Sequence, residues 1–118
     1  MKYELTAPCV QCPFRSDIRP FIAPERARQI LTNNAEFACH KTLDYQRPDE
    51  DGDATETKNT QHCAGVLIIL EKEQRPHQMM RICERLGMYD ASKLKMDAPV
   101  YDSIADAVRA HRKTRKRA

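Results

Sequence analysis

Four of the five cysteines in this sequence have the spacing of metal ligands. Cys9 and Cys12 form a Cys-x-x-Cys pair, which lets two thiolates from one tight turn reach a single ion. Cys39 follows 27 residues after Cys12, and Cys63 a further 24 residues on. Four thiolates satisfy tetrahedral zinc or the four corners of a cubane iron–sulfur cluster. We therefore predict one metal centre with Cys9, Cys12, Cys39 and Cys63 as its ligands.

The identity of the metal is left open by this pattern. Zinc is the default for a reduced, cysteine-rich site, so we expect zinc. A 4Fe-4S cluster is the alternative, because one Cys-x-x-Cys pair with scattered single cysteines is also common in cluster proteins, and Cys12-Pro13 matches the Cys-Pro step of bacterial ferredoxins. His40 and His62 adjoin two of the cysteines and are candidate alternative ligands or partners of the ligands.

Two further observations favour ligation. Cys63 stands at the expected start of an apolar helix, where the helix dipole stabilises a thiolate. Arg15, Arg19 and Lys41 lie close in sequence to the cysteines and could offset the negative charge of four thiolates. The alternatives are metal-free buried cysteines and, less favoured, a disulfide. Cys83 differs from the other four, because its spacing among apolar residues predicts a place in the core.

The elements that must position these cysteines form a small single domain of 118 residues that is mainly α, with about four helices and an irregular metal-binding N-terminal half. The chain has three Phe, four Tyr and no Trp, so its core is thin and a metal cross-link would help it fold. We divide it into a metal-bearing domain over 1–111 and a basic C-terminal tail over 112–118.

Helix signals place the four helices. We expect them from Pro24 to about Asn33, from Cys63 or Ala64 to about Gln74, from Pro76 to a stop at Gly87, and from Tyr101 or Asp102 to about His111. The third helix is expected to bury Met79, Ile82, Cys83 and Leu86. The last is expected to bury Ile104, Ala107, Val108 and His111.

Other segments lack such periodicity. Phe37–His40 is predicted to be a short strand or turn, and residues 44–61 an exposed acidic loop without the ligand spacing of a calcium site. His77 and His111 are isolated in sequence, so we expect them at the surface or at helix ends. The four methionines from Met79 to Met96 are interpreted as core or interface residues.

Charge is distributed unevenly along the chain. Residues 109–118 contain six of the 20 Lys and Arg side chains and no acidic one, whereas residues 1–108 carry a formal charge of −3. A run of this kind gives affinity for phosphates with little sequence readout. We therefore predict DNA or RNA contacts by Arg112, Lys113, Arg115, Lys116 and Arg117. The alternatives are a solvated helix end and a protein partner.

Localisation is predicted from what the N-terminal sequence lacks. No apolar run resembling a signal peptide occurs there, and the longest apolar stretch, residues 64–70, is too short to span a bilayer. We expect a cytoplasmic protein with no membrane contact, whose thiols stay reduced.

No recognisable catalytic set is present, and with only three Gly the chain has no glycine-rich phosphate loop. We lean against an enzyme. The favoured function is a zinc-binding, non-enzymatic binding or regulatory module that contacts nucleic acid through its tail. The alternative is an iron–sulfur protein with a redox or sensor role.

Three cysteine-containing motifs carry a resemblance: Cys9-x-x-Cys12-Pro13-Phe14-Arg15, Phe37-x-Cys39-His40-Lys41-Thr42 and Cys63-Ala64-Gly65. Together with Arg75–Arg81 and Pro99–Ser103, they resemble a family of small uncharacterised bacterial and phage proteins. The resemblance covers most of residues 8–111, leaves the basic tail outside, and implies a shared metal site without an established activity.

Overall fold

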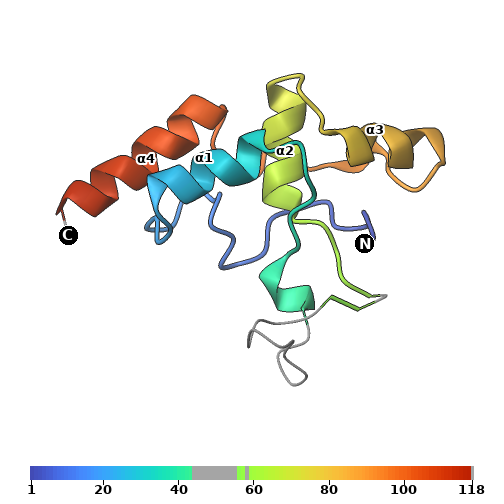
Figure 1. Cartoon of the computed structure of the whole chain (residues 1–118), viewed down its shortest axis with the longest axis horizontal. Coiled ribbons are helices and arrows are strands. Elements are labelled where there is room, and N and C mark those ends of the chain that lie inside the picture. Colours follow the sequence, from blue (N-terminus) through green and yellow to red (C-terminus); the bar gives the residue numbers. More distant parts are fainter. Residues whose placement is uncertain (44–55, 58, 118) are drawn as a thin grey trace.

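The computed structural model describes residues 1–43, 56–57 and 59–117, and side chains up to Arg112. Its elements are α1 (Pro24–Thr32), the 3-10 turn η1 (His40–Thr42), α2 (Ala64–Lys72), α3 (Gln78–Arg85), the 3-10 turn η2 (Ala91–Lys93) and α4 (Ile104–Arg117) (Figure 1). The prediction of a mainly α protein with about four helices is confirmed. Within the described ranges no helix is long and apolar enough to cross a membrane.

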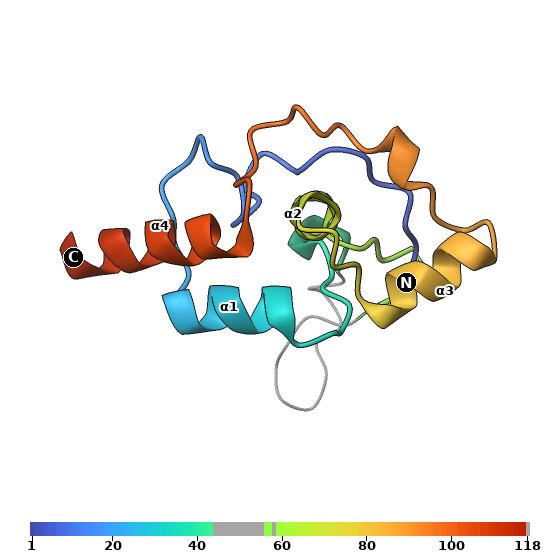
Figure 2. The ribbon, with the colours of Figure 1, turned by 90° about the horizontal axis from the view of Figure 1, so that it is seen from above.

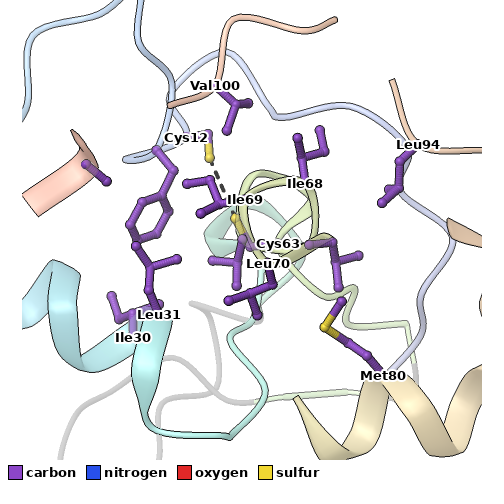
Figure 3. Packing of buried hydrophobic residues seen from close by; sticks show 14 of the residues in the cluster. Cys12, Ile30, Leu31, Cys63, Ile68, Ile69, Leu70, Met80, Leu94 and Val100 are labelled. Carbon is purple, nitrogen blue, oxygen red and sulfur yellow. Dashed lines mark hydrogen bonds between the residues drawn. The ribbon is translucent and has the colours of Figure 1, made fainter. Parts of the chain in front are cut away.

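Helix α2 forms the centre of the core. Its seven residues from Ala64 to Leu70 are all buried, so the helix is covered on every side. Figure 3 shows side chains from the other segments around it, among them Leu31 of α1, Met80 of α3, and Leu94 and Val100 of the segment before α4. A cysteine at the start of α2 is thereby fixed relative to most of the domain.

Helices α1 and α4 lie side by side and run in opposite directions (Figures 1 and 2). α1 begins at Pro24, as predicted, and buries Ala27, Ile30 and Leu31. The side chain of Glu73, directly after α2, accepts a hydrogen bond from the backbone N–H of Ile104 at 2.8 Å and so caps the start of α4. The expected end of α4 near His111 is wrong, because the helix continues to Arg117.

Helix α3 ends where the sequence predicts, but it faces the core differently. Gly87 has φ +74°, and the N–H groups of Gly87 and Met88 bond the carbonyls of Glu84 and Cys83, which is the Schellman arrangement. Met80 and Cys83 are buried, whereas Met79, Ile82 and Leu86 are exposed to 37%, 38% and 67%. The expected inward face was therefore correct only for Cys83. Met88 and Met96 are also exposed, so of the four methionines only Met80 belongs to the core.

Helix α2 ends in the same way without a glycine. Gln74 has φ +57°, its N–H bonds the carbonyl of Glu71, and the N–H of Arg75 bonds that of Leu70 at 2.9 Å. This turn sends the chain toward α3 and leaves Arg75 exposed beside α1 and α4.

The two histidines expected at the surface or at helix ends are both buried, although His77 does stand at a helix end and His111 lies on the inward face predicted for the last helix. His77 is 4% exposed and His111 is 1% exposed. The Nδ1 of His77 accepts a hydrogen bond from the N–H of Met80, so His77 caps α3. The two ring nitrogens of His111 lie 3.1 Å from the carbonyl oxygens of Ile22 and Pro13. These polar contacts compensate the burial of each ring.

The N-terminal half is irregular, as predicted. Isolated bridges replace strands in the part that the structure describes: Lys2 pairs with Gln61, Ala38 with His62, and Arg15 with Val100. The predicted strand or turn at Phe37–His40 is thus one bridge followed by η1. The predicted acidic loop lies mostly outside the described residues.

Candidate metal centre

The bridge between Ala38 and His62 brings two of the predicted ligands together. The N–H of Cys39 bonds the carbonyl of Gln61, and the N–H of Cys63 bonds the carbonyl of Phe37, both at 2.8 Å. Side chains alternate along extended backbone, and directly opposed residues share a face. Cys39 and Cys63 therefore lie on one face of this pair of segments, and His62 lies on the other.

The Cys-x-x-Cys segment forms two successive turns. The N–H of Cys12 bonds the carbonyl of Cys9 at 3.2 Å, and the N–H of Arg15 bonds the carbonyl of Cys12 at 3.1 Å. The Arg15 guanidinium donates two hydrogen bonds to the Asp17 carboxylate, at 2.7 and 2.8 Å, and a third to the Cys9 carbonyl at 3.4 Å. Arg15 thus holds the turn and places its charge near two thiols.

Cys12 and Cys63 meet at the start of α2. Their Sγ atoms lie 3.6 Å apart, although 51 positions separate them in sequence (Figure 3). Both are buried, at 1% and 4% exposure. Backbone N–H groups of Phe14 and Gly65 act to lower the pKa of Cys12, and those of Gly65 and Val66 act in the same direction on Cys63. The first turn of α2 therefore supplies donors to both sulfurs.

Gly65 makes this approach possible. A Cβ built on Gly65 would lie 2.6 Å from the Cys12 Sγ and 3.3 Å from the Cβ of Phe14. Contacts under 3 Å essentially never occur for real Cβ atoms, so any larger residue would push Cys12 away. The glycine is needed for close packing around sulfur.

Cys9 joins the group through Cys39. Both Cys39 and Cys12 act electrostatically on the Cys9 thiol and contribute to raising its pKa. Cys39 is buried and Cys9 is half-buried. The structure thus shows one contact pair, Cys12 with Cys63, and one electrostatic pair, Cys9 with Cys39, with Cys9 also acting on Cys12.

Ionisation differs within the buried pair. The hydrogen bond from Cys63 lowers the pKa of Cys12, assisted by the N–H groups of Phe14 and Gly65 and by the charge of Arg15. The pKa of Cys63 is raised well above its ordinary value, because its proton is held between the two sulfurs and because the thiol is buried. Burial is also the main cause that raises the pKa of Cys9. Cys12 is accordingly the first of these three to become a thiolate.

The donor set fits a thiolate-bound metal in its chemistry. Two of the four sulfurs are in contact, Cys9 interacts electrostatically with Cys12 and Cys39, N–H groups support Cys12 and Cys63, and Gly65 leaves room for the Cys12 sulfur. Among the described residues, no three His, Cys, Asp or Glu side chains form a ready coordination geometry, so binding requires the two pairs to close on one point.

The two candidate histidines lie differently. Both nitrogens of His62 have partners: Nδ1 lies 3.0 Å from the Cys63 carbonyl, and Nε2 lies 2.8 Å from Nε2 of His77. His62 therefore orients the backbone of a ligand rather than facing the sulfurs. His40 is half-buried and opens η1, directly after Cys39.

The predicted nucleic-acid residues continue α4. Arg112 is exposed, while Lys113, Arg115, Lys116 and Arg117 belong to the helix but their side chains are outside the described part. Cys83 is buried in α3, as expected of a core residue.

Gly65 and His77 were missed as contributors to the site region. The Cys63-Ala64-Gly65 motif did contain a signal, because a glycine early in a helix weakens it unless close packing requires it. His77 had no comparable signal, since its partner His62 is 15 positions away.

Comparison with known proteins gives one match. A model of a family of unknown function, DUF6283, covers residues 4–118 and so includes the basic tail that the resemblance had left outside. No curated protein and no solved structure shows a significant match to the chain.

Proposed function

The chain belongs to the DUF6283 family of unknown function, and we propose that it is a zinc-binding module whose single metal is held by Cys9, Cys12, Cys39 and Cys63. The observation that carries this proposal is the meeting of buried sulfurs from distant segments, led by Cys12 and Cys63 at 3.6 Å. A metal there would join the N-terminal segment, the segment before η1 and the start of α2. When bound, zinc would act as a structural cross-link and stabilise the thin core.

The residues around the sulfurs support this role. Arg15 and the N–H groups of Phe14 and Gly65 offset the charge of thiolates. His62 holds the carbonyl of Cys63, and the Ala38–His62 bridge sets the spacing of Cys39 and Cys63. Each of these contacts holds a ligand in place before metal arrives.

The same donor set favours a second candidate, a 4Fe-4S cluster with a redox or sensor role, because N–H···S bonds like those to Cys12 and Cys63 also tune cluster potentials. Purification under anaerobic conditions followed by elemental analysis and an absorption spectrum separates the two. We expect a colourless protein with one zinc per chain. A brown protein with iron and sulfide would support the cluster, and a folded protein without metal would refute both.

We further propose that the module contacts DNA or RNA through Arg112, Lys113, Arg115, Lys116 and Arg117. Support comes from six basic side chains within residues 109–118 and from the continuation of α4 to Arg117, which presents them on a helix. The variant K113Q/R115Q/K116Q/R117Q should bind duplex DNA with a log–log salt slope smaller by about 3.6 than the unsubstituted chain. An unchanged slope would refute a role of the tail.

A further inference from the structure

An arginine-lined groove crosses the body of the domain. It has a volume of about 430 Å³ and lies between α1, the turn after α2, and α4. Ile104 and Val108 line its apolar part, and its walls carry Arg28, Arg75, Arg109 and Arg112. A second hollow of about 290 Å³ shares Arg28, Val108 and Arg112 with it, so the depression continues along α1 toward Pro24.

We propose that this groove binds the phosphate backbone of a nucleic acid. The inference rests on the proposed nucleic-acid contact of the tail and adds a second surface on the folded body. Its arginines come from three separate elements, and two of them, Arg28 and Arg75, are far in sequence from the tail. The fold therefore assembles a positive surface that the charge distribution along the sequence does not show.

The charges around the groove are incompletely compensated. No ion pair joins Arg28, Arg75 or Arg112 to a carboxylate of the described residues, whereas Arg109 contacts Asp106 at 3.3 Å. Glu73 also lines the groove, but its carboxylate accepts the N–H of Ile104. Glu25 borders the adjoining hollow. Three guanidinium groups without an ion pair among the described residues thus share one groove with the Arg109–Asp106 pair and the Glu73 carboxylate, and an anion would relieve the repulsion among the guanidinium groups.

The residue type favours phosphate as the ligand group. All four cations of the groove are arginines, and the planar guanidinium bonds two phosphate oxygens at once, which lysine does not do. Arg109 and Arg112 are three residues apart on α4, and this helix leads directly into the basic tail. A phosphodiester strand is a ligand that repeats its charges along such a path, so we favour it over a single phosphate.

The test uses the full-length, metal-loaded protein and two labelled 20-nucleotide probes, one single-stranded DNA and one duplex. Fluorescence anisotropy is measured over a range of salt concentrations for the variant R28Q/R75Q. Its matched control is R81Q/R85Q, which removes two exposed arginines of α3 and changes the net charge equally. Circular dichroism and metal content check that both variants fold.

We expect R28Q/R75Q to bind more weakly than R81Q/R85Q, with a log–log salt slope reduced by about 1.8 on duplex or about 1.4 on single strands. Equal slopes for the two variants would overturn the groove proposal. The tail variant K113Q/R115Q/K116Q/R117Q separates the two surfaces. If only the tail variant loses nucleic-acid affinity, the tail is supported against the groove. If only R28Q/R75Q loses affinity, the groove is supported against the tail. Binding of heparin without binding of either probe would overturn the assignment to nucleic acid.

Discussion

The Nε2 atoms of His62 and His77 lie 2.8 Å apart inside the core. Because Nδ1 of His77 accepts the N–H of Met80, its Nε2 carries the proton and donates it to His62. Nδ1 of His62 then donates to the carbonyl of Cys63 at 3.0 Å. A continuous chain of hydrogen bonds thus joins the first turn of α3 to a candidate metal ligand, and it requires both imidazoles to be neutral.

Acid should break this chain. Burial, assisted by the neighbouring His77, lowers the pKa of His62 from its ordinary value of 6.5 to about 4. The unfolded chain therefore binds the proton first, and stability present above pH 6.5 is lost as the pH falls toward 4. The full loss from His62 is about 3 kcal/mol.

Urea unfolding of the wild type and of His62→Gln at several pH values measures this loss. The variant should be less stable at pH 7.5, and the difference should shrink between pH 6.5 and 4. Metal content is measured at each pH as well, because His62 contacts the backbone of a predicted ligand and the variant can release metal at a different pH. A difference that stays constant with pH would contradict the prediction.

Substitution of Gly65 should damage the metal centre without touching a ligand. Gly65→Ala places a methyl group 2.6 Å from the Cys12 sulfur, so the thiol must move. We expect zinc affinity to fall at least about tenfold, the lower end of the effect of disturbing the groups around a metal site. Competition with a chromogenic chelator measures it.

Gly87→Ala is the control for that experiment. A Cβ at Gly87 meets nothing within 4 Å, but the residue has φ +74°. The Gly87→Ala substitution should lower the free energy of unfolding by about 1 kcal/mol through backbone strain and leave zinc affinity unchanged. Equal zinc affinity in the two variants would show that Gly65 does not shape the site.

The ligand assignment is tested by comparing two buried cysteines. Cys39 and Cys83 are 5% and 4% exposed, so Ser at either position buries a hydroxyl. Cys39→Ser should lose metal and soluble fold together, because structural metal binding is coupled to folding. Cys83→Ser should keep one metal per chain and lose only packing energy. Elemental analysis of the purified proteins decides, and full occupancy in Cys39→Ser would remove Cys39 from the ligand set.

The end of α2 offers a stabilising substitution. Gln74 is held at φ +57°, where a side chain costs about 1 kcal/mol and glycine does not. Gln74→Gly should raise the free energy of unfolding by about 0.5 kcal/mol, after the greater flexibility of glycine in the unfolded chain is subtracted. Chemical denaturation measures it, and a less stable variant would show that the Gln74 side chain makes a compensating contact.

Much of the helical framework could be predicted from local signals. Pro24 marks the start of α1, the apolar run after Cys63 marks α2, and Gly87 marks the end of α3. Each signal acts within a few residues of the element that it defines, so single-sequence patterns are sufficient to find it.

The orientation of α3 could not be predicted in this way. At about 100° per residue, Met79, Met80, Ile82, Cys83 and Leu86 span an arc of about 160° on the helix, so the face centred on Leu86 and the face of Met80 overlap at Cys83. Contacts from distant parts of the chain select the face of Met80 and Cys83, since Met80 packs against α2 and His77 fixes the first turn. The inward position of His111 was predicted from its spacing along the helix, but its acceptors on Ile22 and Pro13 could not be, because they are 89 and 98 positions away.

At the candidate metal centre, the sequence predicted one site for four cysteines; the structure shows Cys12 and Cys63 in contact, and metal binding by the four stays a prediction. The pairing of Cys12 with Cys63 and of Cys9 with Cys39 depends on the Ala38–His62 bridge and on the turns of the Cys-x-x-Cys segment. The grouping of the groove arginines could not be predicted from the sequence for the same reason, since Arg28 and Arg75 approach α4 only in the folded chain.

Because of the Ala38–His62 bridge, the geometry of the candidate site does not depend on the length of the chain that connects the two bridged segments. The spacing of Cys39 and Cys63 is set by backbone hydrogen bonds at the bridge, not by the number of residues between them. Closing a longer connection costs only about 0.6 kcal/mol for each doubling of its length. The hydrogen bonds that place Cys39 and Cys63 therefore do not depend on the number of residues that connect them, whereas an insertion within Cys9–Cys12 or Cys63–Gly65 would alter the turns that place the sulfurs.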